Sequence, residues 1–304
     1  MFSKKYLFFI IFSFGLIFLT PLPVGAVTKK TNYQDFTAWY QKKFKLKSVP
    51  YRAAALFDAK TLQPLYFYQE NRITPAASLI KLVTAGTVLK YKPNWTKPVN
   101  FTAEENFNLL QQYVEPGDKY SHLLLEGDET ITFEQGFATM LIASTNNVAA
   151  AMPRWLGTSR EEFIKEMRLT ATDWGLKNTT IVEPSGLSLD NTSTAYDMAL
   201  AACGAFTEPQ ISKYSSKPFI SYNLSSGREK LIRHTVHDLR RYPQRYFGAK
   251  TGYLTETKYH ISAGLYTPQG RKVCGAVLSV EKQTESERIM NSLATWADQM
   301  YKWK

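Results

Sequence analysis

The sequence predicts an α+β fold in which both chain ends build one antiparallel sheet, with flanking helices and an inserted all-helical lobe. Two observations support this prediction. Short β-rich runs occur near residues 51–69 and again after residue 216, whereas helical patterns dominate the residues between them. Strands and helices that are kept apart along a chain are typical of α+β proteins rather than of doubly wound α/β proteins.

The first 26 residues predict a secretory signal peptide. A basic start, MFSKK, precedes an apolar run of about 14 residues, and a small-residue pattern ends at Ala26. An uncleaved anchor is the alternative, but a membrane span needs ~20 apolar residues, and Pro21 and Pro23 interrupt the run. We therefore expect an exported protein of the periplasm or cell envelope that starts at Val27, with no stable membrane span after cleavage.

The chain is basic. Its formal net charge is +11, and removal of the two lysines in the signal leaves +9. Such a charge favours an anionic cell envelope, although a merely basic soluble surface is equally open. No nucleic-acid-binding module and no interleaving of aromatic residues with a dense basic stripe occurs in the sequence, so we expect no nucleic-acid partner.

Cysteine and histidine usage leaves one question open and predicts no metal site. Export would permit a disulfide between Cys203 and Cys274, but both lie in apolar contexts, so two buried thiols fit as well. The four histidines have no metal-ligand spacing, and His234 and His237 are expected on the surface. We expect no metal and no cofactor.

The elements of the N-terminal half follow in order. Residues 33–48 predict an amphipathic helix, and the β-rich runs on either side of a turn at residues 58–61 predict a hairpin. A helical pattern begins at Ser78. Thr132 and Gln135 form a capping box that starts a helix ending near Ser144.

The C-terminal half changes from helices to strands. Helical patterns cover about 159–175 and 194–206, with the loop TIVEPSGLS between them. Four short runs then predict antiparallel strands: KPFISYNL, FGAKTGYL, YHISAGLYTP and RKVCGAVLSV. An amphipathic helix over 285–303 closes the chain. We accordingly place a helical lobe at about 92–215 within an α/β lobe made of 27–91 and 216–304.

The first candidate motif is a serine and a lysine in the apolar stretch TPAASLIKLVTA. Ser78 and Lys81 are three residues apart, so on a helix they share a face. A lysine that is buried, or that lies near another cation, can lose its proton and act as a base for the serine. By itself the motif also fits a chance pairing on a solvated helix.

The second candidate motif is Ser144-Thr145-Asn146, where one predicted helix ends and another apolar run begins. The serine can pass a proton, and the asparagine amide can bind a substrate carbonyl or hold the catalytic lysine. An ordinary N-cap serine beside a turn asparagine is the alternative.

The third candidate motif is Lys250-Thr251-Gly252, within FGAKTGYL. On an edge strand, the lysine and the threonine could point into a cleft at a substrate carboxylate, and the glycine would let substrate lie against the backbone. A chance turn is the alternative.

Together the three motifs, in the order S-x-x-K, S-x-N, K-T-G with gaps of 66 and 106 residues, resemble those of penicillin-binding proteins and class A β-lactamases. The chain resembles the serine D,D-peptidases, the low-molecular-mass penicillin-binding proteins, over about residues 50–300. WGLKNTTIVEPSGLS and the short C-terminus are similar to the D,D-endopeptidase branch. Ile80, Thr145 and Asn147 depart from common family forms without changing a motif position.

The resemblance implies a β-lactamase/transpeptidase-like fold and an acyl-enzyme on a D-Ala-linked peptide of peptidoglycan. It implies Ser78 as nucleophile, Lys81 as base and Ser144 as proton relay. It also implies an oxyanion hole from the backbone N–H groups of Ser78 and Tyr253. The substrate would be bound by Asn146, Lys250, Thr251 and Gly252, and β-lactam antibiotics would be covalent inhibitors.

Two other functions remain open at this stage. A class A-like β-lactamase needs a deacylating glutamate, and Glu183 lies in the right interval, but the PSGLS that follows it fits the peptidase loop better. A catalytically inactive envelope-binding protein is the second alternative.

The sequence does not distinguish carboxypeptidase from endopeptidase activity. Arg288 fits a substrate carboxylate contact, although a solvated helix arginine is the preferred interpretation.

Overall fold

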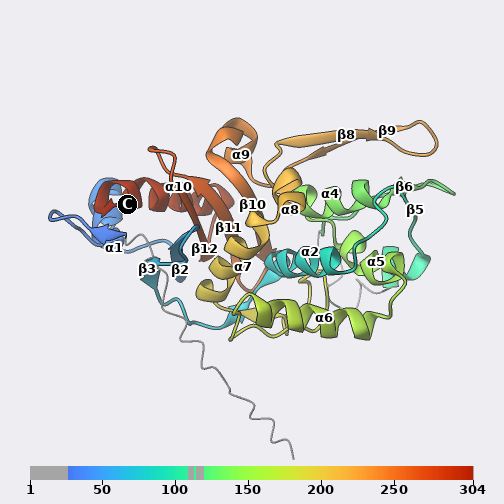
Figure 1. Ribbon diagram of the computed structural model, residues 1–304, viewed down its shortest axis with the longest axis horizontal. Coiled ribbons are helices and arrows are strands. Elements are labelled where there is room, and N and C mark those ends of the chain that lie inside the picture. Colours follow the sequence, from blue (N-terminus) through green and yellow to red (C-terminus); the bar gives the residue numbers. More distant parts are fainter. Residues whose placement is uncertain (1–26, 109–112, 114–119, 304) are drawn as a thin grey trace, which may run out of the picture.

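The computed structural model describes residues 27–108, 113 and 120–303 (Figure 1). The predicted signal peptide therefore lies outside the described residues. The helices are α1 (Phe36–Phe44), η1 (Ala77–Ile80), α2 (Lys81–Lys90), η2 (Glu104–Asn108), α4 (Phe133–Ala143), α5 (Asn146–Leu156), α6 (Arg160–Asp173), α7 (Ala195–Thr207), α8 (Pro209–Ser215), α9 (His237–Arg241), η3 (Pro243–Arg245) and α10 (Gln283–Met300). Within these residues no helix is both long enough and apolar enough to cross a membrane.

A five-stranded antiparallel sheet has the order β10-β11-β12-β2-β3, and four two-stranded ladders surround it. The central strands are β2 (Ala53–Asp58), β3 (Pro64–Tyr68), β10 (Tyr246–Leu254), β11 (Lys258–Tyr266) and β12 (Lys272–Val280). The ladders pair β1 (Thr28–Lys29) with β13 (Tyr301–Lys302), β4 (Thr74–Pro75) with β7 (Thr192–Ser193), β5 (Pro98–Val99) with β6 (Ile131–Thr132), and β8 (Phe219–Asn223) with β9 (Glu229–Arg233). The predicted α+β class and the sheet made from both chain ends are confirmed.

Both faces of the sheet are covered, because alternate residues of β2 enter two different cores. Ala53, Ala55 and Phe57 pack with helices of the middle of the chain, whereas Ala54 and Leu56 pack with residues of α1 and α10. This is the period-two alternation of a strand that is buried on both faces. Figure 1 shows α10 on one side of the sheet and α7 on the other. β10 is an edge strand, and its free edge lies beside η1.

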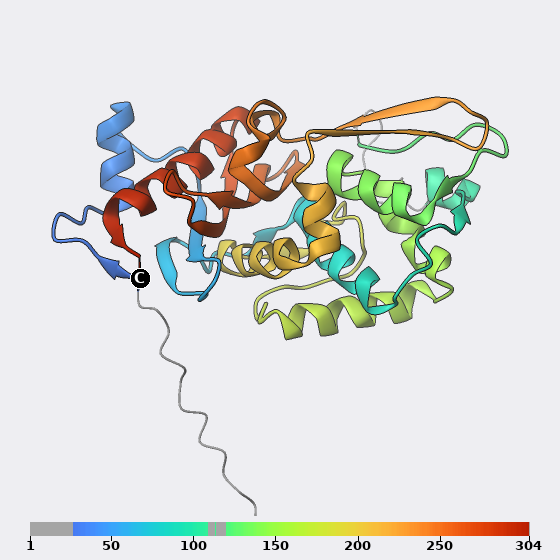
Figure 2. The same cartoon turned by 45° about the horizontal axis from the view of Figure 1, so that its top comes forward.

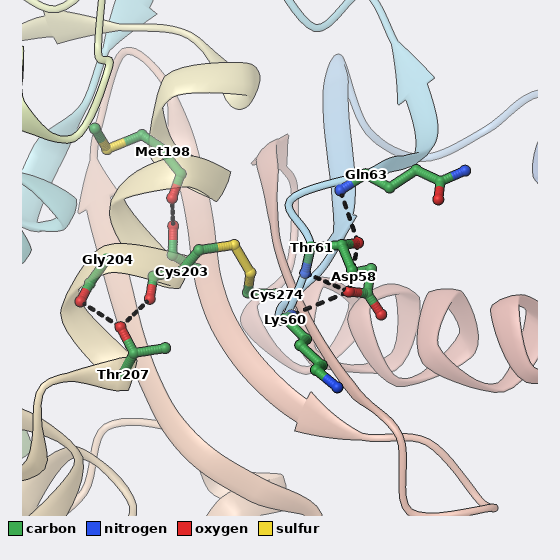
Figure 3. The surroundings of a disulfide bond; sticks show 10 residues. Asp58, Lys60, Thr61, Gln63, Met198, Cys203, Gly204, Thr207 and Cys274 are labelled. Atoms are coloured by element: carbon green, nitrogen blue, oxygen red, sulfur yellow. Dashed lines mark hydrogen bonds between the residues drawn. A yellow bond between two sulfur atoms is a disulfide. The ribbon is translucent and has the colours of Figure 1, made fainter. Parts of the chain in front are cut away.

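A disulfide ties helix α7 to the sheet. Cys203 of α7 is bonded to Cys274 of β12, with 5.4 Å between their Cα atoms (Figure 3). Both residues are buried. The two cysteines therefore pair, which answers the question that their apolar contexts left open.

The stretch KPFISYNL does not join the central sheet. It forms β8, which pairs with β9 from Phe219↔Arg233 to Asn223↔Glu229 in a separate hairpin. In Figures 1 and 2 this hairpin projects along α4 away from the sheet. In β8 exposed residues alternate with half-buried ones, and in β9 with half-buried and buried ones, because only one face of the hairpin is covered. Alternation of exposed and covered residues predicts a strand, but it does not predict which strand is its partner. The sequence alone therefore could not tell whether β8 pairs within the main sheet.

Candidate active site

Ser78 and Lys81 lie where the 3-10 helix η1 meets α2. Side chains three apart eclipse one another in a 3-10 helix. Lys81 Nζ accordingly lies 2.8 Å from Ser78 Oγ. The predicted proximity of the two side chains is present, although the turn that creates it is tighter than the expected α-helix.

The Lys81 ammonium lies in a fully buried site with two further oxygen neighbours. Its Nζ is 2.6 Å from Asn146 Oδ1 and forms a short contact with the backbone oxygen of Ser185. Burial lowers the pKa of Lys81 to about 7, and the negative charge of Glu183 opposes part of that shift. The lysine can thus be neutral at a pH at which an exposed lysine is fully charged.

These three neighbours determine where the lone pair of a neutral Lys81 points. Asn146 Oδ1 and the Ser185 carbonyl oxygen can only accept hydrogen bonds, so they take the two N–H groups of a neutral amine. The Ser78 hydroxyl is the one neighbour of the three that can donate. The lone pair therefore faces Ser78 Oγ, which is the arrangement needed to remove its proton.

A second serine–lysine pair joins distant parts of the chain. Ser144 caps the C-terminal end of α4 with a left-handed φ of 62°, and Lys250 comes from the edge strand β10. Lys250 Nζ donates to Ser144 Oγ at 2.6 Å and to the Thr251 carbonyl at 2.9 Å. Burial, together with the charge of Lys81, holds the pKa of Lys250 well below its usual value. Both lysines of the site are thus desolvated and electrostatically coupled.

The two pairs meet at a cavity of about 210 Å³. Ser78 and Ser144 both line it, while Lys81 and Lys250 are fully buried. The other predicted site residues on its wall are Asn146, Thr251, Gly252 and Tyr253. The structure thus brings together side chains from η1, α4, α5 and β10.

Two glycines allow other segments to approach the nucleophile's backbone. A Cβ on Gly186, which has a φ of 80°, would lie 2.0 Å from the Ala77 carbonyl oxygen. A Cβ on Gly252 would lie 3.0 Å from Ala77 Cβ and 3.2 Å from Ser78 N. Ala77 itself has a left-handed φ of 50°, and strain of this kind is common at functional sites. The role of Gly186 was not predicted, because nothing in the local sequence shows what faces it.

Glu183 organises the loop that carries Ser185. Its buried carboxylate accepts hydrogen bonds from the backbone N–H groups of Ser185 and Ser188, at 2.5 and 3.3 Å, and from Asn191 Nδ2 at 2.5 Å. It does not line the cavity that holds Ser78. The loop also receives a 2.7 Å hydrogen bond from Thr84 Oγ1 at the Pro184 carbonyl. Glu183 therefore acts on the site through loop geometry and through its charge on Lys81.

The expectation that His234 lies on the surface is wrong. His234 is 1% exposed, and its Nδ1 accepts a 3.0 Å hydrogen bond from the backbone N–H of Val236. Burial and the nearby charge of Lys250 lower its pKa to about 3, so the imidazole is neutral at ordinary pH. The sequence indicates a polar residue here, but the packing of this segment against β10 decides its burial. His237, three residues later, is exposed as expected.

Sequence reasoning also missed several polar residues of the cavity wall, among them Thr235 and Gln283. Thr235 Oγ1 accepts a 2.8 Å hydrogen bond from Thr251 Oγ1, and the Thr235 carbonyl accepts one of 2.6 Å from Gln283 Nε2. Both residues line the cavity. No motif marked them, because each enters the site through a tertiary contact with a distant segment.

Arg288 lies on α10 and does not line the cavity. It forms a 2.7 Å ion pair with Glu285, and its guanidinium lies 4.8 Å from the centre of the Phe44 ring. These contacts support the interpretation of a partly solvated helix arginine.

Comparison with solved structures identifies the fold. The D-alanyl-D-alanine carboxypeptidase of Mycobacterium tuberculosis matches with a TM-score of 0.70 and 21% identity, covering 84% of this chain and 95% of that one. A mutant of a Streptomyces DD-transpeptidase matches with a TM-score of 0.74 and 20% identity, covering 83% and 99%. The fold is that of the penicillin-binding proteins and D,D-transpeptidases, as predicted.

The family follows from the sequence. The family model described as D-alanyl-D-alanine carboxypeptidase, Peptidase_S11, matches residues 41–281. The chain belongs to this family. It is 27% identical over 244 residues to D-alanyl-D-alanine carboxypeptidase DacF of Bacillus subtilis, a match that covers 79% of this chain and 61% of that protein. It is 30% identical over 171 residues to a D-alanyl-D-alanine endopeptidase of Pseudomonas aeruginosa, covering 55% and 51%. The matches thus span between half and two thirds of these relatives.

Proposed function

We propose that this protein is a serine D,D-peptidase that cleaves D-Ala-linked peptides of peptidoglycan through an acyl-enzyme on Ser78. The observation that carries the proposal is the set of oxygen neighbours of Lys81, which leaves its lone pair for the Ser78 hydroxyl. A base with a pKa of about 7 is matched to neutral pH. Membership of the family and the names of its relatives agree with this chemistry.

In the acylation step, Ser78 Oγ attacks the carbonyl carbon of the D-Ala residue while Lys81 Nζ takes the hydroxyl proton. The carbonyl oxygen becomes an oxyanion, which the backbone N–H groups of Ser78 and Tyr253 would stabilise. The closeness of Gly252 to Ser78 N supports this pairing, because Tyr253 follows directly on the free edge of β10. The tetrahedral intermediate then collapses and expels the amine.

The leaving amine needs a proton, which Ser144 would relay by giving up its hydroxyl proton and taking one from Lys250 Nζ. Lys250 Nζ occupies the acceptor side of Ser144 Oγ, so the serine's own proton is free to point into the cavity. Thr251, with Lys250 behind it, would receive a substrate carboxylate. Asn146 holds Lys81 with its oxygen, which leaves its amide nitrogen for a substrate carbonyl. Water would then attack the acyl-enzyme and release the product.

The β-lactamase alternative is disfavoured by the position of Glu183. A deacylating base has to hold a water molecule against the ester carbon of the acyl-serine. The Glu183 carboxylate instead accepts hydrogen bonds from its own loop and from Asn191, outside the cavity wall. We therefore propose that penicillin acylates Ser78 as an inhibitor and leaves slowly.

Labelling with a fluorescent penicillin tests the nucleophile. We expect the parent chain to be labelled covalently and the Ser78→Ala variant to remain unlabelled. Equal labelling of both would overturn the mechanism. Rapid turnover of penicillin would favour the lactamase, and no labelling with no hydrolysis would favour an inactive binding protein.

Digestion of purified muropeptides separates the two peptidase activities, because both cut after a D-Ala carbonyl but release different amines. Loss of a terminal D-Ala from uncross-linked muropeptides would define a carboxypeptidase. Conversion of cross-linked dimers to monomers would define an endopeptidase, which the similarity around WGLKNTTIVEPSGLS favours. Action in the periplasm or cell envelope is part of the same proposal, and the Cys203–Cys274 disulfide agrees with an oxidising compartment.

A further inference from the structure

A groove beside the cavity has a cationic wall that the proposed chemistry does not use. It encloses about 520 Å³ between the base of the β8–β9 hairpin and helix α9. Its lining, which we call the cationic groove, consists of Pro218, Phe219, Arg233, His237, Arg240 and Arg241. Figure 1 shows the hairpin and α9 meeting next to β10.

The arginines of this groove have no protein counter-ion among the residues that the structure describes. Arg233, Arg240 and Arg241 are exposed, and none of them takes part in an ion pair there. An exposed guanidinium offers several N–H donors in a planar fork that matches a carboxylate. Three such groups around one groove therefore provide sites for carboxylates that are not part of this chain.

Two acidic side chains of α9 and α10 are already engaged in the fold. Asp238 Oδ2 accepts hydrogen bonds from the Tyr246 hydroxyl and from Asn291 Nδ2, at 2.9 and 3.0 Å. The buried Glu287 carboxylate accepts from the backbone N–H groups of His237 and Asp238, at 3.0 and 2.8 Å. Neither acid lines the cationic groove, so the groove keeps its positive charge.

The groove also has an apolar part. Phe219 lines the groove and is 57% exposed. It lies opposite Arg233 in the β8–β9 pairing. A ligand with negative charges and an apolar or ring surface would complement both parts of this lining.

One short segment connects the cationic groove to the active-site cavity. Thr235 lines the cavity and is held there by Gln283. His237, two residues further along, lines the groove. The segment from Thr235 to His237 therefore contributes lining to both the cavity and the groove.

We propose that the cationic groove binds the carboxylate-bearing stem peptides of peptidoglycan, next to the strand that is being cut. This inference rests on the proposed function. That function makes the substrate a polymer with repeated free carboxylates, alanine methyl groups and sugar rings. The groove would hold the polymer against the cavity. It would contribute little to a small soluble substrate, which cannot reach both sites.

The test uses the triple variant Arg233→Gln/Arg240→Gln/Arg241→Gln in a Ser78→Ala background, so that no turnover occurs. Binding to purified sacculi is measured by sedimentation. The matched control, Lys42→Gln/Lys47→Gln/Lys60→Gln, removes the same charge from exposed lysines outside the groove. We expect the arginine variant to bind about tenfold more weakly, and the lysine control to bind as the parent does.

Four results would overturn the proposal, and the first three concern sacculi. These are unchanged binding by the arginine variant, an equal loss in the lysine control, and undiminished binding to sacculi whose stem carboxylates have been amidated. Tighter arginine-dependent binding to phosphatidylglycerol vesicles than to sacculi would assign the groove to lipid instead, and would also overturn it.

The same arginine substitutions in the Ser78 enzyme separate this proposal from the proposed function. Labelling by fluorescent penicillin should remain at the parent rate, which also reports a folded site, while release of peptides from sacculi should fall about tenfold. If the parent itself is not labelled, the proposed function fails. The sedimentation assay with sacculi still shows whether the cationic groove binds peptidoglycan. If the triple variant does not fold, Arg240→Gln/Arg241→Gln replaces it under the same criteria.

Discussion

Lys250 Nζ and Ser144 Oγ lie 2.6 Å apart although 106 residues separate them in the chain. The contact joins the free edge of the sheet to the C-terminal end of α4. It supplies the Ser144 hydroxyl with a donor on one side, and so leaves the hydroxyl proton for the cavity. We therefore predict that Ser144 relays a proton, and mutagenesis can separate this role from its position at the end of α4.

Ser144→Ala should slow acylation of Ser78 by roughly 10²–10⁴-fold, which is the usual contribution of a positioned proton donor. Stopped-flow labelling with fluorescent penicillin measures the rate. Ser121→Ala is the matched control, because Ser121 lines the same cavity but donates to the Ala143 carbonyl at 2.7 Å. Similar losses in the two variants would contradict a relay through Ser144.

The acylation rate should rise with pH and be half-maximal near pH 7. The sign follows from the base: below its pKa of about 7, Lys81 is protonated and cannot accept the Ser78 proton, and above it the amine is neutral. Penicillin labelling between pH 5 and 9 measures the profile. Lys81→Arg should abolish the reaction, because arginine stays protonated. A rate that falls as the pH rises through 7 would rule out Lys81 as the base.

Glu183→Gln should move this rising limb to lower pH. The negative charge of Glu183 raises the pKa of Lys81, so its removal lets that pKa fall further below the usual value. A deacylating glutamate predicts a different outcome, in which the pH limb stays in place and the penicilloyl-enzyme accumulates for longer. Comparison of the labelling profile with the rate of label loss distinguishes the two roles.

Gly186→Ala should disturb the nucleophile more than the fold elsewhere. The new Cβ would lie 2.0 Å from the Ala77 carbonyl, so the turn that carries Ser78 must move. We expect acylation to fall by roughly 10²-fold. The free energy of unfolding should fall by about 1–3 kcal/mol through overpacking, in addition to about 1–2 kcal/mol from the left-handed backbone.

The control for this variant is Gly270→Ala. Gly270 has a φ of 79°, close to that of Gly186, but nothing lies within 4 Å of its added Cβ. Its free energy of unfolding should fall by only about 1–2 kcal/mol, from the left-handed backbone, with acylation unchanged. Equal acylation rates in the two variants would show that the contact with Ala77 does not matter.

Reduction of the Cys203–Cys274 disulfide should lower the free energy of unfolding by about 2–4 kcal/mol, because the bond closes a loop over a sequence separation of 71 residues. Denaturant unfolding with and without dithiothreitol measures the change, and Cys203→Ser/Cys274→Ser reproduces it without reductant. The acylation rate under native conditions should be unchanged, since neither cysteine lines the cavity. A lower acylation rate in reduced but fully folded protein would show that α7 positions the active site.

The sequence predicted those parts of the molecule that depend on neighbours along the chain. The capping box of Thr132 and Gln135 is present in both of its hydrogen bonds, and the hairpin at residues 58–61 lies between β2 and β3 as predicted. The Ser78–Lys81 contact is also local, since a helical turn places residues three apart on one face. The order of the three motifs then indicated the family without any knowledge of their distances.

Tertiary structure alone decided what surrounds these motifs. The Ser185 carbonyl that directs the lone pair of Lys81 comes from 104 residues away, and the ring of His234 is buried only because its segment packs on β10. β8 pairs with β9 outside the main sheet. Alternation along a strand predicts an extended segment but not its partner, so this pairing too was decided by tertiary structure. The local sequence by itself determined which residues can react. Desolvation and long-range packing decided that the pKa values of Lys81 and Lys250 are lowered there, because burial is a property of all the segments that cover a residue.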